Sequence, residues 1–303
     1  MSSPGRSLDG KVFFITGGAR GIGAAVAAEA ASRGARIALT GLEPQQLAAV
    51  AASLGEGHIH IECDVTDDDS VREAVARTVA ELGGIDMVLA NAGIATYGSV
   101  EATTPEVFNR LVEINLNGVH RTIHYALPHV LARRGWIGTL GSIASYAPLA
   151  GTAPYNASKA GVELYNRALR AEVGWRGVCA ATIHPSWIDT DLVREADADM
   201  SAFGEMRSKL PWPVRSTTSV EACAKAIVDG AERRKDRIFI PRSARLVFWL
   251  RNVLNSRVGE GVLAREAPEL VPKMDAEVAA LGRAMSACSA EINDVDAAPE
   301  RAV

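Results

Sequence analysis

The chain has 303 residues, of which 48% are hydrophobic, so it is long enough to bury a full core. Its net charge of −4, with acidic and basic residues mixed along the chain, argues against a general nucleic-acid-binding protein, which would show a clustered basic excess. No stretch reaches the ~18 apolar residues of a membrane span, and residues 1–10 lack the apolar run of a signal peptide. These properties predict a cytoplasmic enzyme.

Short apolar or β-branched runs alternate with longer alanine-rich runs from the N-terminus onward. Strands are predicted at residues 12–15, 36–40, 58–63, 87–90, 136–140, 178–183 and 237–240. Helices are predicted at residues 22–32, 44–54, 70–82, 108–131 and 155–173. The strands lack polar–apolar alternation, which indicates that both of their faces are covered. Repeated β–α units with right-handed crossovers therefore predict an α/β fold, a Rossmann-type doubly wound parallel sheet of about seven strands with helices on both faces.

Two parts of the chain break this alternation. Residues 191–218 lie between the sixth strand and the next helix, and we expect a mobile or helical insertion there. Residues 243–303 follow the last strand, which Pro241 ends, and are predicted to form a helical extension with helices at 244–254 and 272–285 and a polar tail. We therefore expect one dinucleotide-binding and catalytic domain over residues 1–242, with the extension attached to it.

The segment TGGARGIG, residues 16–23, lies between the first predicted strand and the first predicted helix. Gly17 is expected to take a tight turn, Gly21 to let the backbone approach a pyrophosphate, and Gly23 to let the helix pack closely on the sheet. The helix N-terminus would face the phosphates. Strand, glycine loop and helix in this order predict dinucleotide binding. The loop residues expected at the cofactor are Gly17, Ala19, Arg20, Gly21, Ile22 and Gly23.

The end of the second predicted strand indicates which dinucleotide binds. An NAD site usually has a carboxylate there for the ribose 2′-OH, but here Thr40 and Gly41 precede the first acid, Glu43. Arg20 could reach a 2′-phosphate through a charge-assisted hydrogen bond, and Thr40 could add a hydroxyl. In the alternative, Arg20 is solvated or paired with a surface acid. NADP(H) is therefore the predicted cofactor, and NAD(H) is the alternative.

The cysteines and histidines do not predict a metal site. The four cysteines are far apart and match neither a metal-ligand spacing nor a small disulfide framework, so we expect reduced thiols. Five histidines form no ligand pattern with Cys or Asp, namely His58, His60, His120, His124 and His129. The sixth, His184, precedes Pro185 at the end of a predicted strand, and we expect a buried structural histidine.

Further motifs follow the glycine-rich loop in a recognisable order. They are Cys63-Asp64-Val65, Asn91-Ala92-Gly93, Asn115, Ser142, the segment from Tyr155 to Lys159 (YNASK), and Pro185. With these motifs the chain resembles the short-chain dehydrogenase/reductase family, in its compact branch, over about residues 8–242. The sequence departs from the family at Ser186, where a glycine is usual, and in its C-terminal extension.

The resemblance implies an oxidoreductase that moves hydride between a nicotinamide and a carbonyl/alcohol pair. It assigns catalysis to Asn115, Ser142, Tyr155 and Lys159. Asn115 would hold a water that links Lys159 to solvent, and Lys159 would also bind the nicotinamide ribose. The further cofactor contacts that it implies are Asp64, Val65, Asn91, Ala92, Gly93, Tyr155, Pro185, Ile188 and Thr190. The predicted helices around Asn115 and Tyr155 resemble those of the family's four-helix interface, so a homodimer or homotetramer is expected.

The chemistry of the reaction suits these residue types. Carbonyl reduction leaves an alkoxide to be protonated, and the reverse reaction needs an alcohol deprotonated near neutral pH. Tyr155 and Lys159 are four residues apart and share a helix face. The Lys159 ammonium and the oxidised nicotinamide would lower the pKa of the Tyr155 phenol from its ordinary value of about 10. Ser142 would donate a hydrogen bond to the substrate oxygen. Tyr155 is therefore the predicted acid/base.

The substrate pocket is expected above the carboxyl ends of the strands. The predicted substrate-binding residues are Ser142, Ala144, Tyr146, Tyr155 and Trp187, with further walls from Ile94, Leu192, Phe203, Met206 and Leu210. This set favours a hydrophobic ketone or alcohol, steroid-like, terpenoid, aromatic or fatty, with residues 191–218 as a lid. Residues 245–254 are apolar with flanking arginines, and three uses stay open: packing on the domain or a partner subunit, covering the substrate entrance, or touching a membrane surface.

Two other functions are alternatives. A 3-oxoacyl-thioester reductase of fatty-acid synthesis resembles this loop and these catalytic residues, although the extension after Pro241 argues against it. A nucleotide-sensing protein could keep the fold without turnover, but the intact set of Ser142, Tyr155 and Lys159 argues against that function.

Overall fold

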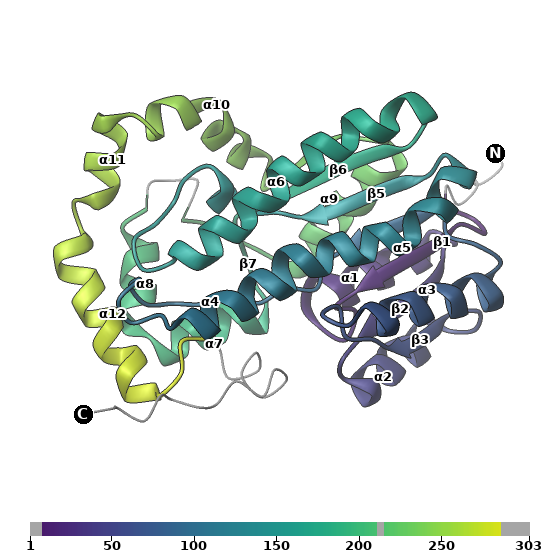
Figure 1. Ribbon diagram of the computed structural model, residues 1–303, viewed down its shortest axis with the longest axis horizontal. Helices are drawn as coiled ribbons and strands as arrows, with labels where there is room; N and C mark the ends of the chain where they lie inside the picture. Colours follow the sequence, from purple (N-terminus) through teal and green to yellow (C-terminus); the bar gives the residue numbers. More distant parts are fainter. Residues whose placement is uncertain (1–7, 211–214, 286–303) are drawn as a thin grey trace.

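The computed structural model describes residues 8–210 and 215–285 (Figure 1). Its centre is a parallel sheet of seven strands in the order β3-β2-β1-β4-β5-β6-β9. The strands are β1 (Val12–Thr16), β2 (Arg36–Gly41), β3 (Ile59–Glu62), β4 (Met87–Ala90), β5 (Trp136–Leu140), β6 (Cys179–Pro185) and β9 (Arg237–Ile240). The strand order reverses between β1 and β4, which makes their carboxyl ends the switch point of the sheet. The predicted Rossmann-type fold is confirmed.

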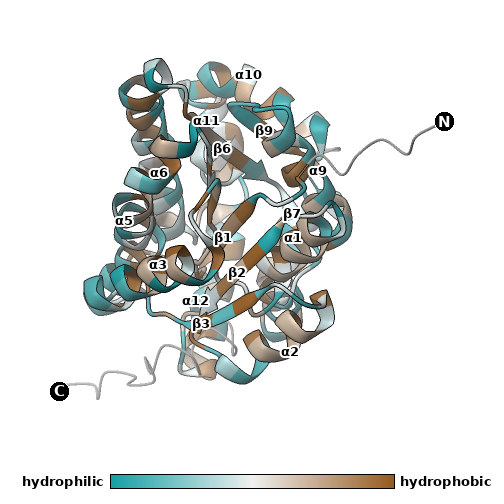
Figure 2. Ribbon diagram, turned by 90° about the vertical axis from the view of Figure 1, so that its right-hand side faces the viewer, coloured by the Kyte–Doolittle hydropathy of each residue, from teal (hydrophilic) through white to brown (hydrophobic). Residues whose placement is uncertain are grey.

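Helices cover both faces of the sheet. One face carries α1 (Gly21–Ser32), α2 (Pro44–Leu54) and α9 (Val220–Glu232), and the other carries α3 (Asp68–Leu82), α5 (Gly118–Arg133) and α6 (Ala153–Val173). In β1, Phe13 and Ile15 pack toward the first group of helices while Val12 and Phe14 pack toward the second. Figure 2 shows the brown, apolar strands between the two helical layers. The apolar runs of the sequence are therefore strands that are buried on both faces.

The long helix predicted over residues 108–131 is interrupted. It begins as α4 (Pro105–Val112), passes through a π-helical segment, η1 (Glu113–Asn117), and continues as α5. A π-helical turn holds one more residue than an α-helical turn, and such turns are frequent at functional sites. Asn115 lies in the middle of this segment.

The part of residues 191–218 that the structure describes is helical, as one of the two expectations had it. It contains α7 (Asp191–Asp199) and α8 (Ser201–Ser208), and ends in β8 (Thr217–Thr218), which pairs with β7 (Trp187–Ile188).

The C-terminal extension forms α10 (Arg245–Leu254), α11 (Arg257–Ala264) and α12 (Ala267–Leu281). The sequence did not predict α11, which contains Gly259 and Gly261. Helix α12 starts before the predicted residue 272 because it accommodates Pro272, and Gly282, at a φ of +67°, ends it. The predicted polar tail and Cys288 lie outside the described residues.

The extension packs back onto the domain at the end farthest from β3 (Figure 1). Met274 and Val278 of α12 share a core cluster with Phe203 of α8 and Tyr97. Asp275 accepts a hydrogen bond from the Ser99 backbone N–H at 2.7 Å.

Within residues 8–210 and 215–285 there is no helix of sufficient length and apolarity to cross a bilayer. Among the same residues, no group of three or more His, Cys, Asp or Glu is placed to hold a metal ion.

Candidate active site

The loop between β1 and α1 has the backbone that a pyrophosphate-binding loop needs. Gly17 and Gly21 have φ values of +65° and +55°, which L side chains rarely adopt. A Cβ on Gly23 would lie 2.1 Å from the Gly17 carbonyl oxygen, so Gly23 lets α1 close on the loop itself. Asn91 supports the loop, because its side-chain amide donates to the Thr16 and Gly17 carbonyl oxygens at 3.0 Å each.

A cavity of about 210 Å³ lies over this loop at the switch point of the sheet. The predicted cofactor residues that line it are Gly17, Ala19, Arg20, Gly21, Ile22, Gly41, Asp64, Val65, Asn91, Ala92, Gly93 and Thr190. Pro185 and Ile188 instead line a second, adjoining cavity, and Thr190 lines both. Bare glycine backbone at the N-terminus of α1 fits the pyrophosphate of a dinucleotide, because no side chain blocks the N–H groups. Leu42 also lines this cavity and was not predicted, and Cys63 lines it together with Asp64 and Val65 of the same motif.

Two residues expected near the 2′ position of the adenosine ribose have partners inside the protein. Thr40 is buried and donates its hydroxyl to the Ile15 carbonyl oxygen at 3.2 Å, so it does not line the cavity. Arg20 does line the cavity, but its Nε donates to Glu43 at 2.8 Å and its Nη2 forms an ion pair with the same carboxylate. Pairing with an acid, the alternative considered from the sequence, is the state that the structure has for Arg20.

The second cavity has a volume of about 440 Å³, and Ser142 and Tyr155 lie in its wall. Ser142 follows β5 and accepts a hydrogen bond from the Ala144 backbone N–H at 3.1 Å, so the hydroxyl proton is left to donate. Tyr155 lies in the first turn of α6, directly after Pro154, a residue type that is favoured at the start of a helix. Burial raises the pKa of the Tyr155 phenol, and a hydrogen bond with Ser142 offsets part of that rise.

Lys159 lies one helical turn after Tyr155 and is buried. Its Nζ donates to the Leu140 carbonyl oxygen at 2.8 Å and lies 5.7 Å from the centroid of the Tyr155 ring. Burial lowers the pKa of Lys159 to about 8. Burial thus disfavours the charged forms of both residues, and the lowering of the Tyr155 pKa by Lys159 stays a prediction.

Asn115 is fixed by its side-chain amide. Its Nδ2 donates to the Ile94 carbonyl oxygen at 2.9 Å and to Ser158 Oγ at 3.2 Å, and its Oδ1 accepts from the Ile94 N–H at 2.8 Å. A Cβ placed on Gly93 would lie 3.0 Å from Asn115 Oδ1 and 3.6 Å from Lys159 Nζ. Both residues therefore adjoin Gly93 in the wall of the first cavity. Ser142 and Tyr155 thus line the second cavity, whereas Asn115 and Lys159 line neither cavity and lie behind Gly93.

The second cavity is mainly apolar. Of the predicted wall residues, those that line it are Ala144, Trp187, Leu192, Phe203 and Leu210. Ile94 lines the first cavity instead, and Met206 is buried in the cluster between α8 and α12. The residues of the extension that complete the wall are Ser243, Leu246, Val247, Leu250 and Leu254. Their helical spacing is visible in the sequence, but it did not distinguish among the three uses considered for this segment.

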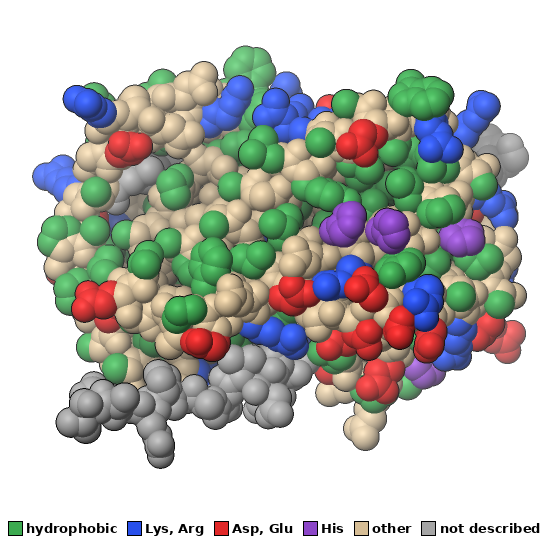
Figure 3. All heavy atoms as spheres, in the orientation of Figure 1, with side chains coloured by type: hydrophobic (Ala, Val, Ile, Leu, Met, Phe, Trp, Pro, Cys, Tyr) green, Lys and Arg blue, Asp and Glu red, His purple; other side chains and the backbone are tan. Residues whose placement is uncertain are grey.

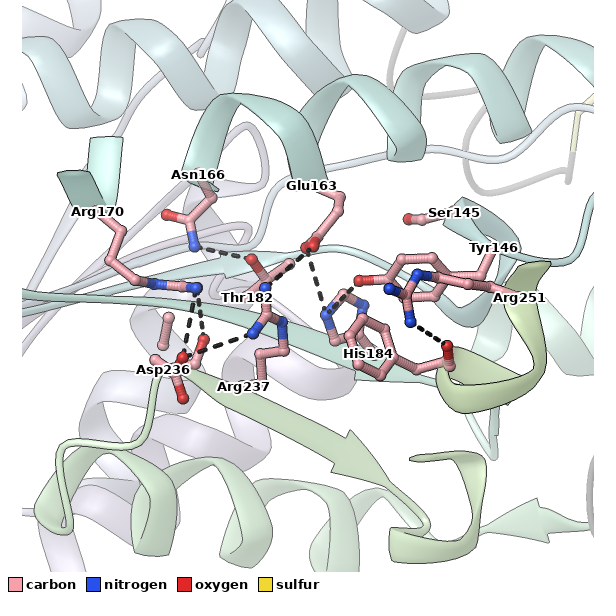
Figure 4. A network of polar contacts seen from close by, with 12 residues as sticks. Ser145, Tyr146, Glu163, Asn166, Arg170, Thr182, His184, Asp236, Arg237 and Arg251 are labelled. Atoms are coloured by element: carbon pink, nitrogen blue, oxygen red, sulfur yellow. Dashed lines mark hydrogen bonds and ion pairs between the residues drawn. The ribbon is translucent and has the colours of Figure 1, made fainter. Parts of the chain in front are cut away.

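Tyr146 lies outside the second cavity, because the short 3-10 turn Ile143–Ser145 separates it from Ser142. Figure 4 shows its hydroxyl pointing toward His184, with 3.4 Å between the hydroxyl and Nε2. His184 Nε2 also lies 3.5 Å from Glu163 Oε2, and its Nδ1 lies 3.4 Å from the Ser142 carbonyl oxygen. Burial lowers the pKa of His184 to about 4, so the ring is neutral at pH 7. It has the buried, bonded position of a structural histidine, directly behind Ser142.

Residues 11–201 match the family model described as short chain dehydrogenase. Over 197 residues the chain is 32% identical to 3-oxoacyl-(acyl-carrier-protein) reductase FabG of Escherichia coli strain K12. This alignment covers 65% of this chain and 81% of that protein. It is 38% identical over 193 residues to D-threitol dehydrogenase of Mycolicibacterium smegmatis, with 62% of this chain and 74% of the relative covered.

Solved structures give the same picture. A short chain dehydrogenase from Burkholderia cenocepacia J2315, in complex with NADP, matches with a TM-score of 0.71 and 30% identity, over 79% of this chain and 99% of that one. A short chain dehydrogenase/reductase from Burkholderia phymatum, in complex with NAD, matches with a TM-score of 0.72 over 82% of this chain and 95% of that one. At 21% identity, the second match shows the fold alone.

Proposed function

The chain belongs to the short-chain dehydrogenase family, and on this basis we propose that it is an NADP(H)-dependent oxidoreductase that interconverts a hydrophobic carbonyl compound and its secondary alcohol. One observation carries the proposal. A cavity over a glycine-rich loop and a larger apolar cavity share four lining residues, and Ser142 and Tyr155 line the larger one. The shared residues are Ile22, Leu140, Thr190 and Leu192. A nicotinamide and a carbonyl carbon placed on the two sides would meet there.

The cofactor would lie with its pyrophosphate on Gly21 and its adenosine between Gly41 and Asp64, and it supplies or accepts the hydride when bound. The Ser142 hydroxyl orients the substrate oxygen and stabilises the charge that develops on it. The Tyr155 hydroxyl gives its proton to that oxygen in reduction and takes it back in oxidation. Both steps thus use a hydroxyl group in the wall of the second cavity, that of Ser142 or that of Tyr155.

Lys159 and Asn115 act through Tyr155, by stabilising its phenolate and by resupplying its proton. The Lys159 ammonium, 5.7 Å from the phenol ring, favours the phenolate that remains after the proton has left. A water held near Asn115 would pass a proton between Lys159 and solvent, and Gly93 leaves room beside both side chains because it has no Cβ. The proton lost by Tyr155 is thus replaced without opening the substrate cavity.

A screen of nicotinamide absorbance tests this function. Purified protein is mixed with NADPH and a panel of ketones and aldehydes, and with NADP⁺ and the corresponding alcohols. We expect turnover that favours bulky apolar substrates, because the 440 Å³ cavity has mainly apolar walls. Turnover of small polyols alone would contradict the substrate class, and no turnover across the panel would favour a nucleotide-sensing protein.

Reduction of 3-oxoacyl thioesters is the second candidate function. The identity to the Escherichia coli reductase supports it, and an acyl chain is also apolar. The wall contributed by α10 distinguishes the two candidates, because a thioester on a carrier protein must reach Tyr155 past Leu246 and Leu250. Activity on carrier-bound thioesters that exceeds activity on free ketones would favour this second function.

The ion pair between Arg20 and Glu43 leads to a prediction about the cofactor. Replacing Glu43 with glutamine removes the carboxylate that competes with a 2′-phosphate for the Arg20 guanidinium, and so should strengthen NADPH binding relative to NADH. Replacing Arg20 with alanine should weaken NADPH binding by about tenfold or more, because a hydrogen bond to a charged group contributes about 1.5–3 kcal/mol. Isothermal titration with both cofactors measures the two effects. Tighter binding of NAD(H) by the wild type would contradict the NADP(H) preference.

We also propose a homo-oligomer that forms through α4, α5 and α6. Figure 3 shows apolar side chains gathered over this face, with histidines beside them. Phe108 of α4 and Leu164 of α6 are among the exposed large apolar residues of the described chain. Exposed apolar area of this kind is typical of a subunit interface.

A further inference from the structure

Helices α10 and α11 carry exposed apolar side chains on their outer sides. Trp249 and Val253, four residues apart on α10, are 66% and 60% exposed. Val258 and Val262, four residues apart on α11, are 76% and 67% exposed. A spacing of four places each pair on one face of its helix. The two helices follow one another around one end of the molecule (Figure 1), and we call these four residues with the neighbouring arginines the α10–α11 face.

This face is positively charged in an acidic protein. Residues 242–265 contain five arginines and a single acid, Glu260, whereas the whole chain has a net charge of −4. Four of these arginines are exposed, namely Arg242, Arg245, Arg257 and Arg265. The Arg245 guanidinium lies 5.3 Å from the centroid of the Trp249 ring. Exposed tryptophan and valine beside several arginines is the combination by which an amphipathic helix binds an anionic bilayer surface.

The adjoining side of α10 forms the wall of the apolar cavity. Leu246, Leu250 and Leu254, at successive turns, line that cavity. Leu246 and Leu250 nevertheless stay about half exposed, so they lie at its rim. Phe248 anchors the helix by packing against the rings of Tyr146 and Phe239. The rim of the cavity and the exposed tryptophan therefore belong to one anchored helix.

We propose that the α10–α11 face binds the surface of an anionic lipid bilayer. Trp249 and Val253 would enter the boundary between headgroups and acyl chains, and the exposed arginines would bind lipid phosphates. The rim of the apolar cavity would then face the membrane, from which an apolar molecule could enter without crossing water. The binding itself does not depend on the reaction proposed above.

A second copy of the chain fits this face less well. A two-fold contact brings the same patch of both subunits together, so the arginines of one copy would face those of the other. Like charges placed together in an interface weaken it, whereas lipid phosphates neutralise them. The charge of the face thus favours a bilayer over self-association.

Vesicle flotation with the full-length protein tests the proposal. We expect the protein to float with phosphatidylcholine vesicles that contain phosphatidylglycerol, to float less with phosphatidylcholine alone, and to be released by salt. Replacing Arg242 and Arg245 with glutamine should lower partitioning about fivefold for each arginine. Replacing Trp249 and Val253 with serine should lower it by roughly tenfold or more, because apolar contact is lost as well.

Trp175 provides the matched control. It is 81% exposed and also lies beside an arginine, Arg176, at 5.9 Å, but it follows α6, away from α10 and α11. Trp175→Ser should float like the wild type. Trp249→Phe should still float, but should lose the blue shift of tryptophan emission that vesicles cause in the wild type.

Three results would overturn the proposal. The first is no flotation with anionic vesicles, and the second is equal flotation of the wild type and the Trp249/Val253 double variant. The third is a protein that does not bind vesicles but uses Trp249 to self-associate or to bind an acidic carrier protein. Because flotation is measured without substrate or cofactor, its failure is distinct from a failure of the proposed reaction.

Discussion

Replacing Tyr155 with phenylalanine is expected to lower turnover about 10³-fold, within the range that a positioned acid/base contributes. The change removes one oxygen, the atom proposed to carry the proton, and leaves the ring in place. Tyr155 lines the second cavity and not the cavity over the glycine-rich loop. Cofactor affinity should therefore change little.

Steady-state kinetics and isothermal titration of NADPH measure the two sides of this prediction. Tyr165→Phe is the matched control, since Tyr165 is on the same helix but bonds His120 at 3.1 Å on an exposed surface. We expect the control to keep both turnover and affinity. Turnover in Tyr155→Phe equal to that of the wild type would refute the acid/base assignment.

Replacing Lys159 with methionine is expected to remove most activity while stabilising the fold at neutral pH. Lys159 is buried, and its pKa falls from 10.5 to about 8 because of that burial. One pKa unit corresponds to about 1.4 kcal/mol, so the buried ammonium lowers the free energy of unfolding by about 3 kcal/mol. Methionine carries no charge, and the loss of the hydrogen bond to Leu140 offsets about 1 kcal/mol of the gain.

The stability advantage of Lys159→Met over the wild type should fall as the pH rises. Below pH 8 both the folded and the unfolded chain hold the Lys159 proton, so the buried ammonium lowers the free energy of unfolding by its full amount. Between pH 8 and 10.5 only the unfolded chain holds it, so the stability of the wild type rises relative to the variant. Above pH 10.5 the lysine is neutral in both states and the cost is gone.

Urea unfolding of both proteins across this pH range measures the difference in unfolding free energy. Lys225→Met serves as the control, because it removes an ammonium that is exposed on α9. A difference between wild type and Lys159→Met that stays constant with pH would contradict this account of the buried charge.

Much of the fold could be predicted because the sheet is covered on both faces. The strand Met87–Ala90 then consists of apolar residues alone, and Trp136–Leu140 contains only one polar residue, the buried Thr139; the structure has both at the predicted bounds. The pairing of Tyr155 with Lys159 was predictable from their spacing on one helix, and the resemblance to the family added Ser142. A spacing of four on α6 places Tyr155 and Lys159 on one face of that helix.

What could not be predicted depends on the directions of individual side chains. Tyr146 follows Ser142 closely in the chain, yet the 3-10 turn between them places it with His184 outside the cavity. Both Arg20 and Glu43 were identified in the sequence, but their pairing requires two loops to approach each other. Thr40 ends a strand as expected, but its hydroxyl bonds Ile15 within the sheet.

The π-helical segment around Asn115 left no signal in the sequence, since α4 and α5 each keep ordinary helical spacing. In its geometry it is equivalent to one extra residue inserted in a continuous α-helix. Deleting one residue between Glu113 and Asn117 would restore a continuous α-helix, but it would turn one side of the helix by about 100° relative to the other. Asn115 would then lose Ile94 and Ser158. The irregular turn is therefore what holds the Asn115 amide against Ile94 and Ser158, and a regular helix of the same length could not place it there.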